Sequence, residues 1–262
     1  MTSAVRLCPG DRPSTRAADR PDPVKSGALK ALAIGVALLN FAPIFFLGAG
    51  LFFLAQLVDR LDPRCRRMSL AGLGLVVLGG LAGAASDFSM ALSGEGIPLL
   101  ATLLYVFGAP GMALVAAALL RARATVQGRL LNRDPWLVPS LISWTFLISA
   151  FYLKDSVPGE DWKRALAFLS LLATAGACLA AGALGWRRQL HMAAGLFALN
   201  AVATAAMIGM KVFTSENIWI QMLEFMIALA AQSAFAFASW RVAAEYQARV
   251  GPTAPVAPKN LL

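Results

Sequence analysis

The stretch Asn217–Trp240, NIWIQMLEFMIALAAQSAFAFASW, decides the fold class, because it is apolar over a length that crosses a lipid bilayer. Among the polar side chains that interrupt it are Asn217, Gln221, Glu224, Gln232 and Ser239. At about 100° per residue they fall within an arc of about 80° of a helix. The stretch is therefore predicted to be a transmembrane helix with a polar inner face and an apolar lipid face.

The composition extends this prediction to the whole chain. Of the 262 residues, 58% are hydrophobic and only 14% are charged, whereas a soluble domain carries about 25% charged residues. The charges cluster between apolar runs of about 18 to 30 residues, as they do between membrane-spanning helices. We therefore predict an all-α polytopic integral membrane protein, a bundle of seven transmembrane helices with short loops. The net charge of +9 is assigned to loops that meet anionic headgroups, and no nucleic acid is expected as a partner.

The apolar runs give the boundaries of the expected spans. These are approximately residues 29–58, 68–86, 97–120, 136–153, 165–186, 190–210 and 217–240. The transmembrane domain, 28–241, is expected to follow a disordered basic tail of residues 1–27 and to precede a disordered cytoplasmic tail of residues 242–262. The first run is too short for two crossings and long for one. Because it also holds Asn40 and Pro43, a tilted or kinked helix is expected there.

Small residues predict where helices approach one another. Gly72, Gly79, Gly83 and Ser86 share one face of the second span, and Ala177, Ala181 and Gly185 share one face of the fifth. Such faces let the backbone of another helix come close. The third span holds Pro110, which is expected to bend the helix rather than to mark a functional break.

Basic residues set the expected orientation. The loops 59–67, 121–133 and 187–188 and the C-terminal tail hold 13 Lys and Arg, whereas the other three loops hold four. The positive-inside rule then places the C-terminus in the cytoplasm and, with seven crossings, the N-terminus outside. If the first run does not span, the basic N-terminal tail stays inside. The expected location is a bacterial inner membrane or a plasma membrane.

Glu224 organises the candidate site, because it is the carboxylate well inside a span. On the sixth span, Asn200, Thr204 and Lys211 lie within about 40° of one another around the helix. A tight hairpin between the last two spans would place Thr204 level with Glu224 and Lys211 level with Asn217. The predicted substrate-binding or proton-binding residues are Glu224, Gln221, Asn217, Lys211, Asn200, Thr204, Gln232 and Asp87.

Two interpretations of this polar cluster stay open. In the first, desolvation favours a protonated Glu224 in a pocket that takes up protons or a small ligand. In the second, Lys211 neutralises Glu224 and the polar stripe ties two helices together. Asp87, expected at the same outer face, competes as a partner for Lys211.

Enzyme chemistry is disfavoured by the residues that the chain lacks. His191 is its single histidine, so haem held by two histidines and zinc sites built on histidine clusters are not expected. We find no serine nucleophile elbow, no phosphate-binding glycine loop and no lysine near the centre of a span. We expect no cofactor and no metal. Cys65, although flanked by arginines, is expected to be an incidental thiol rather than an acylated one.

The sequence therefore favours a small-solute or proton-linked transport-type or ligand-binding protein of the lipid bilayer. The alternative is a non-catalytic membrane subunit or sensor that docks a protein partner through its cytoplasmic arginine-rich loops. A third hypothesis is an intramembrane lipid-modifying enzyme that uses Glu224 and Asp87 as acid and base.

Overall fold

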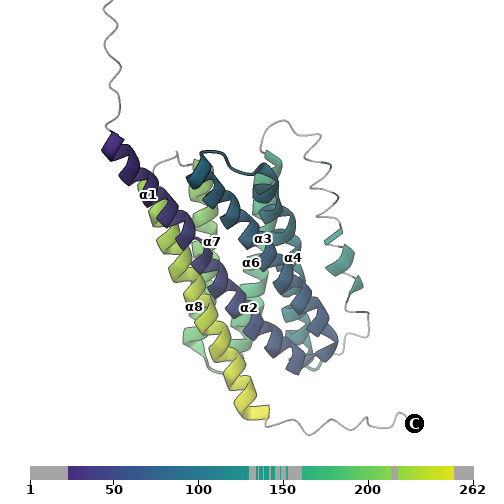
Figure 1. Ribbon diagram of the computed structural model, residues 1–262. Coiled ribbons are helices and arrows are strands. Elements are labelled where there is room, and N and C mark those ends of the chain that lie inside the picture. The colour runs from purple at the N-terminus through teal and green to yellow at the C-terminus, as the bar shows by residue number, and fades with distance from the viewer. Residues whose placement is uncertain are drawn as a thin grey trace, which may run out of the picture.

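The computed structural model describes residues 23–129, 134, 136, 137, 139–141, 143, 144, 148, 152, 161–213 and 218–250 (Figure 1). Its elements are α1 (Pro23–Leu39), α2 (Phe41–Leu61), the 3-10 helix η1 (Pro63–Cys65), α3 (Arg66–Ser93), α4 (Pro98–Val126), α6 (Asp161–Arg187), α7 (His191–Phe213) and α8 (Ile218–Val250). The long elements are all helices, which confirms the predicted all-α class.

Five stretches of the described chain are long and apolar enough to cross a membrane. They are Ala31–Leu61, Pro63–Ser93, Pro98–Val126, Arg164–Arg187 and Met222–Ala248. The expected sixth span corresponds to α7, whose apolar part His191–Met207 is shorter. The expected fourth span, 136–153, lies mostly outside the described residues. The membrane-protein class is thus supported, and the count of seven crossings stays a prediction.

The first span is divided at Asn40 into two helices, whereas the expected tilt or kink of this span stays a prediction. Helix α1 ends at Leu39 and α2 begins at Phe41, with Asn40 between them. The Asn40 amide still donates to the Val36 carbonyl at 3.1 Å, but Pro43 has no N–H to donate to the Leu39 carbonyl. The missing donor accounts for a break in the helix one turn before the proline.

Helix α8 continues past the expected span boundary at residue 241. It reaches Val250, and Val242, Ala243 and Tyr246 are buried along this extension. The Tyr246 hydroxyl donates to the Leu184 carbonyl of α6 at 3.5 Å, and the Arg188 guanidinium lies 4.6 Å from the centre of the Tyr246 ring. These contacts hold the end of α8 on the turn between α6 and α7.

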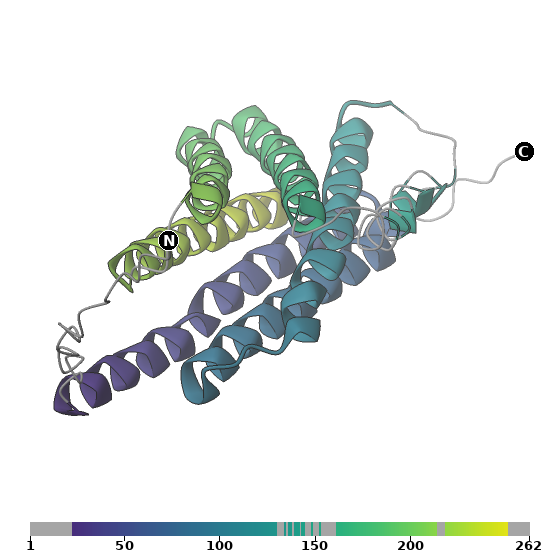
Figure 2. The same ribbon diagram turned by 90° about the horizontal axis from the view of Figure 1, so that it is seen from above.

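Six of the described helices form a closed ring. Each packs mainly against two neighbours, in the order α2, α3, α4, α6, α7, α8 and back to α2. Figure 2 shows α6 and α7 on the opposite side of α8 from α1 and α2. Aliphatic, aromatic and alanine side chains from all six helices fill the centre of the ring.

The small-residue face of α3 is confirmed, and its partner is α4. A Cβ added to Gly72 would lie 2.7 Å from the Gly111 carbonyl oxygen, and one added to Gly111 would lie 2.9 Å from the Gly72 oxygen. Further along, a Cβ on Gly79 would lie 3.2 Å from the Leu104 oxygen. Ser86 donates to the Ile97 carbonyl at 3.3 Å. The two backbones therefore touch, and α4 continues through Pro110 beside this contact.

The small-residue face of α6 is confirmed as well. Ala177, Ala181 and Gly185 are all buried. A Cβ on Gly185 would lie 3.3 Å from the Val242 side chain of α8. Because α6 also packs along α7, its small residues let three helices meet at close range.

Helices α4 and α6 run parallel to each other. Trp162 and Leu166, near the start of α6, pack with Tyr105 and Val106, near the start of α4. Further along both helices, a Cβ on Gly176 would lie 3.9 Å from the Ala116 Cβ. The end of α4 and the beginning of α6 therefore lie at opposite ends of the bundle.

The α3–α4 contact can be tested by adding one methyl group. We expect Gly72→Ala to lower the free energy of unfolding by about 1–3 kcal/mol, because the two backbones must separate. Thermal unfolding in a mild detergent measures this. Gly74→Ala is the matched control, since a Cβ there meets nothing within 4 Å. Equal stability of the two variants would contradict the close contact.

Candidate intramembrane polar site

The relative position of α7 and α8 is set by two aromatic rings. Phe197 and Phe235 meet edge to face, with ring centres 5.6 Å apart. The two helices are consecutive and joined by residues 214–217, so they run antiparallel. One turn from these rings toward the connection, Asn200 of α7 and Gln232 of α8 lie level with each other. By the same register Thr204 lies level with Ala228, and Glu224 lies about one turn nearer the connection than expected.

Asn200 is the most deeply buried of the predicted site residues whose side chains the structure describes. It is 1% exposed, and its Nδ2 donates to the Cys178 sulfur of α6 at 3.6 Å. Its Oδ1 is buried and has no hydrogen-bond partner in the described part of the chain. The same holds for Gln232 Oε1 and Ser239 Oγ. Since buried acceptors are normally paired, each of these oxygens could accept a hydrogen bond from a donor. Ser239 lies about 10 Å along α8 from Gln232, so the candidate site is restricted to Asn200 and Gln232.

Thr204 has a local role. Its hydroxyl donates to the Asn200 carbonyl at 2.8 Å, within the same helix. Serine and threonine inside apolar helices commonly satisfy their hydroxyl hydrogen in this way. Of the predicted polar stripe on the sixth span, the side chains of Asn200 and Thr204 are described. Of these two, Asn200 makes the contact with another helix.

Glu224 lies half-buried on α8. Lys211 lies in α7 and Gln221 in α8, but their side chains, and the whole of Asn217, fall outside the described residues. The predicted pairing of Glu224 with Lys211 thus stays a prediction.

Asp87 contacts the break in the first span. The Asn40 Nδ2 donates to Asp87 Oδ2 at 3.5 Å, which links α3 to the α1–α2 junction. Helix α3 packs mainly on α4 and α2, whereas α8 packs mainly on α2 and α7. This contact supports a structural role for Asp87 and gives no support to a shared site with Glu224.

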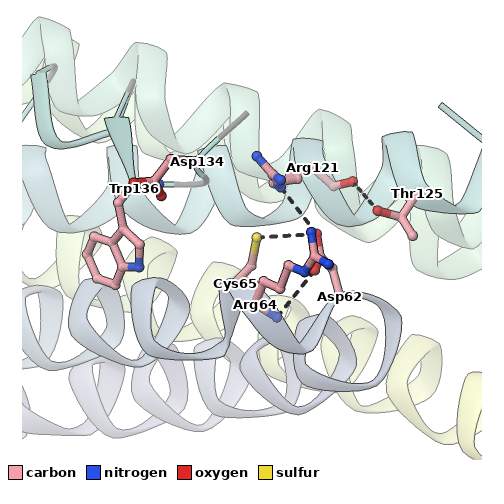
Figure 3. A network of polar contacts seen from close by, with 7 residues as sticks. All are labelled: Asp62, Arg64, Cys65, Arg121, Thr125, Asp134 and Trp136. Atoms are coloured by element: carbon pink, nitrogen blue, oxygen red, sulfur yellow. Dashed lines mark hydrogen bonds and ion pairs between the residues drawn. The ribbon is translucent and has the colours of Figure 1, made fainter. Parts of the chain in front are cut away.

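A polar network that the sequence did not predict lies at the arginine-rich end of the bundle (Figure 3). Arg121 Nε of α4 lies 3.2 Å from Asp62 Oδ2, and these side chains are only 13% and 12% exposed. Asp62 Oδ1 accepts from the Arg64 amide at 3.3 Å, which caps η1, and Cys65 donates to Asp62 Oδ2 at 3.6 Å. One carboxylate therefore fastens the α2–α3 connection to α4. In the sequence, the signal for this network is that Asp62 stands between Arg60 and Arg64, where an acidic side chain could pair with a basic one.

Cys65 is fully buried. Its thiol is enclosed beside Asp62, so an acyl group would have to displace packed side chains. This agrees with the expectation of an incidental thiol. His191 packs edge to face on Trp186, with ring centres 4.4 Å apart, at the turn between α6 and α7.

Comparison with protein-family models, with curated proteins and with solved structures finds no match to this chain. Within the described ranges, no group of three or more His, Cys, Asp and Glu side chains could hold a metal ion. Any assignment of function therefore depends on the geometry of the helices.

The buried Asp62–Arg121 pair gives a stability prediction. We expect Asp62→Asn to lower the free energy of unfolding by about 2–3 kcal/mol, because a nearly buried guanidinium loses a charged partner. The variants Asp62→Asn, Arg121→Gln and the double variant, compared by thermal unfolding, isolate the pair energy.

The control for this prediction is a second ion pair at the same end of the bundle. Arg66 Nε and Asp59 Oδ2 lie 3.7 Å apart with side chains 62% and 37% exposed. Asp59→Asn should therefore cost less than about 1 kcal/mol. If both aspartates cost the same, the Asp62–Arg121 pair has no special role in fastening α2 to α4.

Proposed function

We propose that this chain is a multi-pass membrane protein that takes a proton or another small hydrogen-bond donor into a polar site between α6, α7 and α8. Two functions fit such a site: transport of a small solute, including proton-linked transport, and binding of a ligand. The supporting observation is Asn200, whose buried Oδ1 lacks a partner among the described residues. Gln232, at the same level on α8, adds a second acceptor in the same situation.

The free-energy cost of burying unpaired acceptors supports the presence of a bound ligand. A buried polar group that gives up water without a new partner costs about 1–3 kcal/mol. A purely structural amide pair would recover that cost by bonding donor to acceptor across the helices. Here the Asn200 amide donates to the Cys178 sulfur. The side-chain oxygens of Asn200 and Gln232 therefore have no donor among the described residues. Water, a hydronium ion or an ammonium group would satisfy them, since each of these brings hydrogen-bond donors.

The proposed topology has seven crossings. Because α4 and α6 run parallel, the connection between them has to return from one end of the bundle to the other, which the expected span 136–153 would do. The arginine-rich ends of α2, α4, α6 and α8 favour a cytoplasmic C-terminus. Glu224 would then lie in the outer half of the membrane, about 12 Å along α8 from Gln232.

The alternative function is a non-catalytic membrane subunit or sensor. It is favoured by Arg60, Arg64, Arg66 and Arg67, which are exposed around the α2–α3 connection. In this case a stoichiometric protein partner should be recovered in mild detergent, and changes at Glu224 should alter stability alone. The third hypothesis, a lipid-modifying enzyme, requires Glu224 and Asp87 to approach one cavity, and it stays a prediction.

The first functional test replaces the carboxylate. We expect Glu224→Gln to abolish pH-dependent solute uptake or proton flux in proteoliposomes that contain a pH-sensitive dye, because the glutamine amide cannot bind and release a proton as a carboxylate does. Glu245→Gln, near the other end of the same helix, is the control and should retain the flux. Unchanged flux in Glu224→Gln would refute Glu224 as the proton-binding group of this function. If Glu224→Gln lowers the thermal stability and the wild type itself carries no flux, Glu224 has a structural role.

The second functional test separates ligand binding from stability at Asn200. Leucine has nearly the same shape as asparagine and leaves no unpaired polar group, so Asn200→Leu should leave the free energy of unfolding within about 1 kcal/mol or raise it. The flux should nevertheless be lost. Thr204→Val removes only a bond within α7 and should keep the flux. If Asn200→Leu unfolds as readily as a core cavity variant, Asn200 is structural.

A further inference from the structure

A groove of about 280 Å³ lies between α6 and α7. It is lined by Cys178, Leu179, Gly182, Ala183, Trp186, Ala194, Ala198 and Ala201. Leu179 and Trp186 are 70% and 62% exposed, so the groove opens on the outer surface of the helix ring. In a chain embedded in a membrane, that surface faces lipid.

The shape and chemistry of the groove suit a narrow apolar chain. From Cys178 to Trp186 it follows α6 for about 12 Å. The walls carry glycine and alanine in the middle, Gly182, Ala183 and Ala198, where larger side chains would have filled the space. Its lining side chains carry no charge. A row of methylene groups would pack along such walls better than a branched side chain would.

An exposed arginine follows one end of the groove in the sequence. Trp186 lies at this end, and Arg187, next to it, is exposed. Arg188 is held over the Tyr246 ring, which leaves Arg187 as the outward-facing cation of the turn. Tryptophan and arginine in this arrangement are typical of the membrane interface, where anionic headgroups lie.

We propose that this groove holds one acyl chain of an anionic phospholipid whose phosphate lies beside Arg187. A second copy of the chain fits less well. Two copies in one membrane share the same orientation, so a symmetric contact over this groove would bring the Arg187–Arg188 turns of both copies together. Those like charges would repel, whereas a phosphate is attracted by them.

The test uses the full chain in a non-ionic detergent, analysed by native mass spectrometry with added lipid. The lipids are phosphatidylglycerol and phosphatidylcholine with the same two oleoyl chains. We expect one retained lipid per chain, with phosphatidylglycerol preferred. Arg187→Gln should weaken phosphatidylglycerol binding about fivefold, as expected for one interfacial cation, and phosphatidylcholine binding by less, because the choline ammonium group already compensates its phosphate. Arg187 is exposed, so this variant does not threaten folding.

A second variant tests the groove itself. Ala198 is exposed, and Ala198→Leu should fill the groove and abolish retention of both lipids. Ala206→Leu, on an exposed position of α7 outside the groove, is the matched control and should retain them. The proposal is overturned if the wild type retains no lipid or retains both lipids equally. It is also overturned if Ala198→Leu keeps the lipid, or if it changes only the oligomeric state.

Discussion

Backbone-to-backbone contact between helices is the constraint on which this structure depends. In a lipid environment the hydrophobic effect does not drive helices together, so they associate through close packing and hydrogen bonds. Gly72 and Gly111 provide such packing between α3 and α4, where neither position has room for a side chain. Gly50 lets α2 and α8 approach closely as well, since a Cβ there would lie 2.6 Å from the Phe235 ring and 3.1 Å from the Ala236 Cα. These contacts close the ring of helices.

Phe235 connects this packing to the candidate site. Its ring is buried against Gly50 of α2 on one side and meets Phe197 of α7 on the other. The ring thereby fixes how far α7 is displaced along α8. That displacement places Asn200 level with Gln232, one turn away. The polar site is therefore positioned by an apolar side chain, and its geometry follows from the core packing rather than from its own hydrogen bonds.

The arginine-rich end of the bundle is held by contacts between polar and aromatic side chains. At the arginine-rich end, Asp62 fastens α2 and η1 to α4, and Arg188 and Tyr246 fasten the α6–α7 turn to α8. These contacts leave Arg187 and the arginines of the α2–α3 connection facing outward. A fixed scaffold with exposed cations suits a surface that meets lipid headgroups. The proposed polar site and the proposed lipid groove meet at Cys178, which lines the groove and accepts from Asn200.

The sequence by itself predicted the all-helical class, an irregular first span around Asn40 and Pro43, and the two small-residue faces. Those features follow from local chemistry: apolar length, the missing N–H of proline and the absence of side chains on one helix face. The identity of the partner helices, α4 for Gly72 and α8 for Gly185, was decided only in the tertiary structure. So were the register between α7 and α8, the pairing of Asp62 with Arg121 and the contact of Asp87 with Asn40. Helical periodicity tells which residues share a face, but the axial offset between two helices depends on how particular side chains interlock.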